Sequence, residues 1–448
     1  MDEYNFVSAG GIVGLMAIAW VLSANHRRIN WRVIIFGLAL QLAIGALVFL
    51  TPGSRGVLIG LNDAVVKVIT AAQAGQEFVF GPLATKDLVL KDPDPTKAVI
   101  LATQAFPMVI FFAALMALLY YWRIMPLIIR GFAWLFTRLM RISGAESLCT
   151  ASNIFVGVES ATTVRPYLPQ MTRSELCTIL TAGMATVAST TLAIYVLLLK
   201  DTFPTIAGHL ISASLMSAPA AIVMSKLIYP ETAEPLTLGR NIRPAWQRES
   251  GAIDSIISGA MAGVKLLVGI VALLIAFLGL IAIVDLMLAP AGEGCQWVVN
   301  HFGPRFGCNE PVDFQWSLAT GLAYLMYPFA VAIGVPPADA LLAGRMLGER
   351  MVATEIPAYL RLAAALKDST LVHPRSAVVF AYALCGFAHV ASLAFFIGGI
   401  AALVPERRRD LAAVGLRALL AATLACLMTG AVAGAFFHTA QTVIRAAG

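Results

Sequence analysis

Charge is scarce in this chain. Only 12% of its 448 residues are Asp, Glu, Lys or Arg, whereas 59% are hydrophobic and the mean hydropathy is +0.83. Soluble domains carry about twice that share of charged residues. The shortage excludes an ordinary soluble globular protein and indicates a membrane protein with several spanning segments. The net charge of +6 does not require a nucleic-acid partner, because basic residues in short loops also set membrane topology.

Catalytic and nucleotide-binding motifs are missing as well. The sequence has no glycine-rich phosphate-binding loop, no His-Glu-x-x-His and no Gly-x-Ser-x-Gly, so it gives no support for an enzyme. An ATP-driven pump would need a nucleotide-binding domain or subunit, and this chain contains no such domain. The opening Met-Asp-Glu-Tyr lacks the basic segment of a signal peptide. We therefore expect residues 6–23 to remain as a first span.

Cysteine is infrequent, with six in the chain. Four lie in or beside apolar segments without metal-ligand spacing, and we interpret them as small core residues; they are Cys149, Cys177, Cys385 and Cys426. Cys295 and Cys308 bracket a polar loop. They could form a disulfide if that loop faces an oxidising compartment, and the number of cysteines leaves this question open.

Long apolar runs are abundant. A membrane-spanning helix needs about 20 apolar residues. Eight segments meet this requirement, at 6–23, 32–50, 99–121, 175–199, 205–229, 256–289, 376–403 and 411–437. The sequence therefore predicts an all-α membrane protein with eight spans.

Four other apolar segments do not fit as simple spans. Residues 123–142 carry four arginines among apolar side chains and predict an amphipathic helix in the membrane interface. Residues 313–334 predict a similar surface helix, with a ninth span left open. Residues 145–169 and 335–360 combine apolar stretches with Gly, Pro and a glutamate. We interpret these two as re-entrant hairpins, whose non-helical backbone must be satisfied by protein or by a wet cavity.

Basic residues indicate the orientation. They cluster after the first, third, fifth and seventh spans, at 26–32, 123–141, 226–248 and 406–410. All four clusters lie on the cytoplasmic side if both termini are outside, and the loop at 51–98 then faces outward. Arg345, Arg350 and Arg361 oppose this rule, and we interpret them as structural or functional charges.

The order of the segments repeats weakly. A hairpin followed by two spans occurs twice, which predicts inverted repeats of the kind found in secondary transporters. We divide the chain into five parts. They are 1–98 (spans one and two with the outward loop), 99–142 (span three and the interfacial helix), 143–255 (first hairpin, spans four and five), 256–334 (span six, outward loop and surface helix) and 335–448 (second hairpin, spans seven and eight).

Each hairpin contains a glutamate, Glu159 in the first and Glu355 in the second. A carboxylate at bilayer depth costs roughly 2.5–3.5 kcal/mol, so such groups usually face a protein interior or a wet cavity. We interpret both as candidate binding residues. The alternative is that each is an interfacial charge at the end of a hairpin.

Two spans contain candidate helix breaks. Residues 185–191 form a small, hydroxyl-rich cluster, and carbonyls freed there could hold a small cation together with the first hairpin. Ordinary helix packing by small residues is the alternative. In the seventh span, Gly386 precedes His389 and Ser392. His389 could contact a ligand, carry a proton, or simply bond to a neighbouring carbonyl.

Several stretches match one known family, in its order and over almost the whole chain. They are Phe-Phe-Ala-Ala-Leu-Met (111–116), Ser-Gly-Ala-Glu-Ser-Leu (143–148) with Asn-Ile-Phe-Val-Gly (153–157), Arg-Pro-Tyr-Leu (165–168), Tyr-Ala-Leu-Cys-Gly-Phe-Ala (382–388) and Leu-Val-Pro-Glu-Arg-Arg (403–408). The chain resembles the concentrative nucleoside transporters. The resemblance implies a homotrimer in the cell membrane and a sodium site formed by Asn153, Val156, Thr186 and Val187.

The resemblance also implies solute contacts. On the sugar side they fall on Glu355, Phe387, Ser392 and His389, the last standing where the family has Asn. On the base side the family's Gly-Gln-Thr-Glu becomes Gly157-Val158-Glu159, one residue shorter and without the Gln. A missing Gln removes a paired donor and acceptor, so base specificity should differ. The expected function is sodium-coupled import of nucleosides or close analogues; proton coupling and a non-transporting sensor or channel are the alternatives.

Overall fold

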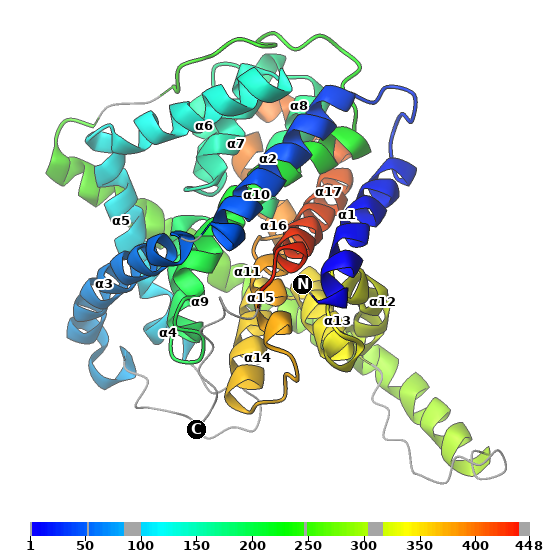
Figure 1. Ribbon diagram of the computed structural model, residues 1–448. Coiled ribbons are helices and arrows are strands. Elements are labelled where there is room, and N and C mark those ends of the chain that lie inside the picture. Colours follow the sequence, from blue (N-terminus) through cyan, green and yellow to red (C-terminus); the bar gives the residue numbers. More distant parts are fainter. Residues whose placement is uncertain (1, 52, 85–99, 246–248, 303–316, 439–448) are drawn as a thin grey trace.

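The computed structural model describes residues 2–51, 53–84, 100–245, 249–302 and 317–438. Within these ranges the chain is helical and forms no β-strand (Figure 1). Eight of the described helices are long and apolar enough to cross a membrane. Three of them are single helices: α1 (Glu3–Val21), α2 (Trp31–Leu50) and α10 (Ile206–Ile228). A fourth, Ala252–Pro290, lies within α11 (Ala252–Phe302). The other four each combine two elements: Gly56–Ala84 joins most of α3 (Ser54–Phe80) to η1 (Gly81–Ala84), Leu101–Tyr121 joins α4 (Leu101–Gln104) to α5 (Pro107–Tyr121), Arg173–Leu199 joins α8 (Arg173–Ala185) to α9 (Ser189–Leu199), and Pro405–Ala435 joins η5 (Pro405–Arg407) to α17 (Arg408–Ala435).

The predicted number of eight therefore holds, but one member of the set differs. The interpretation of 51–98 as a loop was wrong, because α3 fills Ser54–Phe80. Asn62, Asp63 and Lys67 lie within it and dilute its hydropathy, and its best window averages 1.4, the lowest of the eight. The predicted span at 376–403 is not among these eight, because its predicted break divides it into two short helices, α15 (Pro374–Ala383) and α16 (Val390–Leu403).

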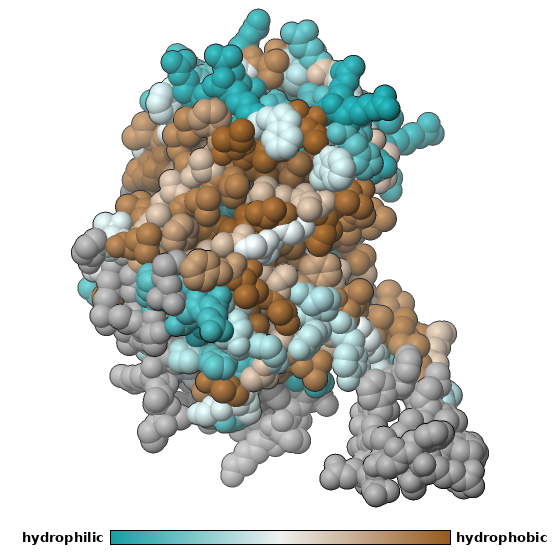
Figure 2. Space-filling view, turned by 45° about the vertical axis from the view of Figure 1, so that its right-hand side comes forward, coloured by the Kyte–Doolittle hydropathy of each residue, from teal (hydrophilic) through white to brown (hydrophobic). Residues whose placement is uncertain are grey.

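An apolar band crosses the face of the molecule seen in Figure 2. There, hydrophobic side chains lie below a hydrophilic upper end, and more hydrophilic side chains follow beneath them. Helix α11 contributes strongly, since side chains such as Ile275 and Leu286 are 70% and 74% exposed. An exposed apolar band of this kind is typical of a protein surrounded by lipid.

A helix is present at each of the two places where a surface helix was predicted. Helix α6 (Ile124–Met140) buries Ile129, Phe136 and Met140 against α2, α5 and α7 and is amphipathic as expected. Helix α12 (Leu318–Ala332) packs along α13, where a Cβ on Gly344 would lie 2.3 Å from the carbonyl oxygen of Ala323. The close approach requires glycine at that position.

Two helical hairpins occupy the predicted places. The first consists of α7 (Gly144–Asn153), the short helix η2 (Val158–Val164) and the turn η3 (Leu168–Gln170). The second consists of α13 (Pro337–Val352) and α14 (Glu355–Lys367), so its second arm extends beyond the predicted end at residue 360.

Both predicted helix breaks are present as well. Helix α8 (Arg173–Ala185) gives way to extended backbone at Thr186 and Ala188 before α9 (Ser189–Leu199) begins. The second break separates α15 from α16, and Gly386 within it has φ +126°, a conformation that favours glycine. Each hairpin packs against the other repeat, because α14 contacts α9 and η2 contacts α16.

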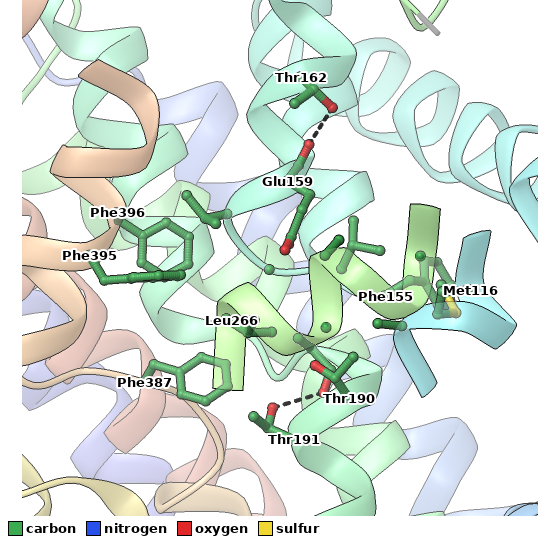
Figure 3. A pocket seen from close by; sticks show the side chains of 18 of the residues that line it. Met116, Phe155, Glu159, Thr162, Thr190, Thr191, Leu266, Phe387, Phe395 and Phe396 are labelled. Atoms are coloured by element: carbon green, nitrogen blue, oxygen red, sulfur yellow. Dashed lines mark hydrogen bonds between the residues drawn. The ribbon is translucent and has the colours of Figure 1, made fainter. Parts of the chain in front are cut away.

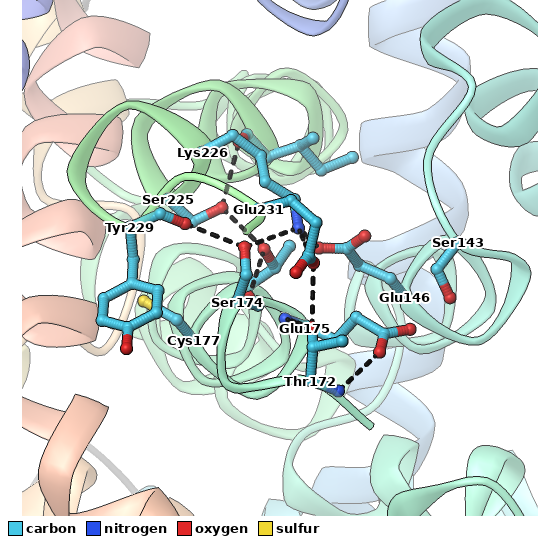
Figure 4. A network of polar contacts seen from close by, with 12 residues as sticks. Ser143, Glu146, Thr172, Ser174, Glu175, Cys177, Ser225, Lys226, Tyr229 and Glu231 are labelled. Carbon is cyan, nitrogen blue, oxygen red and sulfur yellow. Dashed lines mark hydrogen bonds and ion pairs between the residues drawn. The ribbon is translucent and has the colours of Figure 1, made fainter. Parts of the chain in front are cut away.

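A buried polar network fixes the start of the first hairpin (Figure 4). Nζ of Lys226, near the end of α10, lies 2.6 Å from Oε1 of Glu146 in α7 and 3.5 Å from Glu231. The same nitrogen donates to Oγ of Ser174 in α8 at 2.9 Å. Breaking such a buried ion pair on one side leaves an uncompensated charge, so this network ties α7 to α8 and α10.

The structure describes the side chains of four of the six cysteines. Cys149, Cys177, Cys385 and Cys426 are buried, in agreement with the interpretation as core residues. The proposed pairing of Cys295 with Cys308 falls outside the described residues, because side chains are not described at 291–302 and neither backbone nor side chains are described at 303–316.

Candidate binding site

A cavity of about 840 Å³ lies between the two hairpins and the two helix breaks. Both Glu159 and Glu355 line it, although 196 positions separate them in the chain. The predicted residues that line the cavity are Val156, Gly157, Val158, Glu159, Glu355, Phe387, His389 and Ser392. The two carboxylates therefore line one chamber, in which Glu355 is buried and Glu159 is exposed.

Glu355 is the first residue of α14, and its side chain is 5% exposed. The hydroxyl of Tyr195 in α9 donates to Oε1 at 2.7 Å. Nε2 of His389 lies 3.0 Å from Oε2. Oε2 nevertheless has no aligned hydrogen-bond donor within the described part of the chain, so this oxygen can accept a hydrogen bond from a bound solute.

His389 caps the N-terminus of α16. Its Nδ1 accepts a hydrogen bond from the backbone N–H of Ser392 at 3.1 Å. In a neutral imidazole the other nitrogen then carries the proton. The bonding pattern therefore places the proton on Nε2, the ring nitrogen that lies 3.0 Å from Oε2 of Glu355. The hydroxyl of Ser392 donates back to the carbonyls of Phe387 and His389.

A second part of the cavity borders on Phe387 and is lined by aromatic rings. Figure 3 shows the rings of Phe387, Phe395 and Phe396 on one side and the side chain of Glu159 extending from η2 on the other. Aromatic faces stack on flat rings, and a carboxylate accepts hydrogen bonds from N–H groups. This part of the cavity therefore fits a planar, nitrogen-containing ring.

The predicted cation residues lie beside this cavity, at the tip of the first hairpin. The hydroxyl of Thr186 donates to the carbonyl of Asn153 at 2.8 Å, which joins α7 to the break after α8. Oδ1 of Asn153 accepts from Ser160 at 2.7 Å. Within the described ranges no donor bonds to the carbonyl of Val156. Asn153, Thr186 and Val187 are at most 1% exposed.

These groups all offer oxygen atoms as metal ligands, either from side chains or from backbone carbonyls freed by the helix breaks. Sodium in transporters is held by ligands of this kind, so the residues fit a sodium ion in chemical type. Sequence reasoning missed Ser214 of α10, whose hydroxyl donates to the carbonyl of Ile154 at 3.1 Å and accepts from the N–H of Val187 at 3.4 Å. Nothing in the sequence around Ser214 distinguishes it from the other serines of α10.

Sequence comparison covers nearly the whole chain with models of one family. Residues 10–83 match the model described as the Na⁺ dependent nucleoside transporter N-terminus, and residues 209–434 match the corresponding C-terminus. Residues 102–202 match a model described as nucleoside recognition. The chain belongs to the concentrative nucleoside transporter family. Its relatives in this family are transporters and not enzymes.

Individual relatives of the concentrative nucleoside transporter family agree with this assignment. The nucleoside permease NupC of Helicobacter pylori is 33% identical, with 96% of this chain and 97% of the relative covered. The uncharacterized transporter YutK of Bacillus subtilis is 36% identical, with 95% and 98% covered. Solute carrier family 28 member 3 of mouse is 34% identical over 98% of this chain, but the chain spans only about 60% of that relative's length.

The fold agrees too. The structure described as CNTnw in an inward-facing substrate-bound state superimposes with a TM-score of 0.83 at 32% identity, covering 96% of this chain and 98% of that one. The all-helical architecture is therefore that of a concentrative nucleoside transporter.

Proposed function

We propose that the protein is a sodium-coupled importer of nucleosides or close analogues. One observation carries the proposal: Glu159 and Glu355, from hairpins in different halves of the chain, line the same cavity, beside an oxygen-rich cluster at the tip of the first hairpin. As the membrane assembly we propose a homotrimer in the cell membrane with both termini outside and re-entrant hairpins in inverted repeats. We keep the bounds of the five parts given above, with α3 in place of the outward loop in the first part.

The sugar end of the solute would bind at the second hairpin. Oε2 of Glu355 accepts from a sugar hydroxyl, and Nε2–H of His389, 3.0 Å away, donates to the same or the neighbouring hydroxyl. Ser392 and Phe387 complete this end of the cavity. A carboxylate beside an N–H donor suits adjacent hydroxyls, each of which both donates and accepts.

The base end would bind between the aromatic rings and the first hairpin. Glu159 accepts from an N–H of the base, and Phe387 and Phe396 provide apolar surface. Val158 and Gly157 offer no side-chain polar group, so Glu159 supplies the carboxylate contact that this end can make. A single carboxylate favours bases that present N–H donors over those that present only acceptors.

Sodium would bind to Asn153, Val156, Thr186 and Val187. Val156 directly precedes Gly157 of the solute cavity, so an ion there orders the tip of the hairpin that contacts the base. If sodium binding orders the solute site, sodium raises the affinity for the solute, and the solute raises the affinity for sodium by the same factor. Movement of the two hairpins against the remaining helices would then give alternating access.

A second candidate is proton coupling. It is favoured by the contact of 3.0 Å between His389 and Glu355, since a proton shared by this pair would change the charge of the sugar end. Histidine can change its charge at physiological pH. Uptake into vesicles with sodium and proton gradients imposed separately distinguishes the two ions. Failure to accumulate any solute under either gradient would instead support a sensor or a channel.

The decisive experiment is a binding screen with the purified full chain. Nucleosides, nucleobases and nucleotides are titrated in sodium and in choline buffers. We expect nucleosides to bind more tightly than the matching nucleobases, and sodium to strengthen that binding. Glu355→Gln should weaken nucleoside binding at least tenfold, because hydrogen bonds to a charged group contribute about 1.5–3 kcal/mol. Equal binding of nucleosides by Glu355→Gln and the native chain would remove Glu355 from the sugar site.

A further inference from the structure

A positive charge is buried in the second hairpin without a carboxylate partner. Arg350 of α13 is 0% exposed and is the largest fully buried side chain of the described residues. None of the ion pairs in the described ranges includes it. Its Nε has no hydrogen-bond partner there. Because burial of an unpaired charge is costly, something else in the fold must compensate it.

The compensating charge is the end of a broken helix. Nη1 of Arg350 donates to the carbonyl of Ala383 at 2.5 Å, and Ala383 is the last residue of α15. The unsatisfied carbonyls at a helix C-terminus carry about half a negative elementary charge. Arg350 therefore sits where the fold concentrates negative potential.

The end of α8 lies close to the same place. A Cβ on Gly386, in the break after α15, would lie 2.7 Å from the carbonyl oxygen of Ala185, the last residue of α8. Cys426 of α17 contacts that carbonyl at 3.8 Å and also lies beside the guanidinium of Arg350. Two helix C-termini thus approach each other, and a buried cation stands next to them.

The first hairpin has an uncharged residue, Asn153, beside its own helix break. Asn153 lies at the end of α7 and contacts the break after α8 through Thr186. Arg350 lies in the last turn of α13 and contacts the end of α15. The glutamate of each hairpin follows shortly afterwards, Glu159 after Asn153 and Glu355 after Arg350. The first arm of one hairpin therefore places an oxygen ligand beside a helix break, and the first arm of the other places a cation beside the second break.

We propose that Arg350 is a built-in cation at the second helix break, so that the protein couples one sodium ion, at the first hairpin, to each solute. The proposal rests on the sodium coupling proposed above. It implies that the sugar end of the cavity, which the second hairpin carries, is formed with or without sodium. Only the base end, on the first hairpin, depends on the ion.

Chemical rescue tests the role of the charge. Arg350→Ala is titrated with uridine and adenosine in the presence of low guanidinium, with urea at the same concentration as the uncharged control. Thermal unfolding of the same samples is followed in parallel and needs no solute. We expect a loss of nucleoside affinity of at least tenfold in the variant and recovery of affinity and of melting temperature with guanidinium but not with urea. Unchanged binding by Arg350→Ala, equal recovery in urea, or recovery with neither compound would each overturn the proposal.

The sodium dependence tests the stoichiometry. We expect a Hill coefficient near one for sodium in the native chain and a steeper dependence, or a much higher sodium requirement, in Arg350→Ala. The matched control is Arg345→Ala on the same helix, whose side chain is 51% exposed and pairs with Glu349; it should behave like the native chain. A Hill coefficient near two in the native chain contradicts the proposal.

Two further variants keep the test informative if Arg350→Ala does not fold. Arg350→Lys retains the positive charge, and Arg350→Met has a similar length without charge. We expect Lys to preserve nucleoside binding and Met to reduce it, and equal behaviour of the two overturns the role of charge. If the native chain binds nucleosides without any response to sodium, the proposed function fails, whereas guanidinium rescue still decides whether Arg350 acts as a cation.

Discussion

The hydroxyl of Tyr195 donates a hydrogen bond of 2.7 Å to Oε1 of Glu355, across the boundary between the two repeats. Tyr195 belongs to α9 and is fully buried, and its ring stacks on Tyr359 of α14 with centroids 4.4 Å apart. It does not line the cavity. Tyr195 therefore holds one carboxylate oxygen of Glu355 and leaves the other directed toward a solute, which makes it a positioning residue.

Removal of the Tyr195 hydroxyl should weaken sugar binding, although Tyr195 itself does not line the cavity. In Tyr195→Phe we expect nucleoside affinity to fall about tenfold, which corresponds to about 1.4 kcal/mol, within the range for a hydrogen bond to a charged group. Titration of a ribonucleoside and its dideoxy analogue provides the measurement. The dideoxy analogue should lose much less affinity, because it lacks the hydroxyls that Glu355 would bind. Tyr121→Phe, outside the cavity lining, serves as the control, and equal losses for both analogues would assign Tyr195 a purely structural role.

The side chain of His389 should be replaceable by asparagine but not by alanine. Asparagine is a good N-cap residue and keeps a hydrogen-bonding group near Glu355, whereas loss of a cap costs about 1 kcal/mol. We expect His389→Asn to stay within about threefold of native nucleoside affinity and His389→Ala to lose more than tenfold. Binding titrations at fixed sodium check this.

The control for His389 is His373, which precedes α15 in the same N-cap position but makes no side-chain cap bond. His373→Ala should leave nucleoside affinity unchanged. If His389→Ala also binds like the native chain, the cap and the contact with Glu355 do not support the sugar site.

The hydroxyl of Thr186 should set the sodium requirement. Thr186→Val keeps the shape but loses the hydrogen bond to Asn153, so the sodium concentration for half-maximal nucleoside binding should rise about tenfold. Thr186→Ser keeps the hydroxyl and should stay near native. Thr423→Val removes a hydroxyl that bonds only within its own helix, to Leu419 at 3.0 Å, and should not alter the sodium response. An identical sodium curve for Thr186→Val and the native chain would exclude Thr186 from the ion site.

Adjacent glycines in α16 should differ sharply in tolerance to alanine. A Cβ on Gly399 would lie 2.4 Å from Cγ2 of Val158 in the first hairpin, whereas a Cβ on Gly398 would meet no atom within 4 Å. Valine is stiff at χ1, so Gly399→Ala should displace Val158 and lower nucleoside affinity several-fold, while Gly398→Ala should not. The double change Gly399→Ala with Val158→Ala should restore most of the loss. Without such recovery, the contact between α16 and the hairpin does not shape the cavity.

Hydropathy and local motifs predicted much of the architecture. The two hairpins and both helix breaks were found because Gly, Pro and hydroxyl residues interrupt otherwise apolar runs at 145–169, 335–360, 186–188 and 384–389. The helix α3 was missed because amphipathic helices dilute their apolar residues with polar ones, and a loop can have a similar composition. These signals are local along the chain, which is why a single sequence contains them.

By itself the sequence determined that this chain is an α-helical membrane protein of one family, with a carboxylate in each of two hairpins. Only the tertiary structure decided which distant groups meet: Tyr195 with Glu355, Ser214 with the tip of the first hairpin, and Arg350 with the end of α15. The physical reason is that side-chain direction and helix packing fix such contacts. A residue buried against its own helix and one buried against a distant carboxylate therefore look the same in sequence.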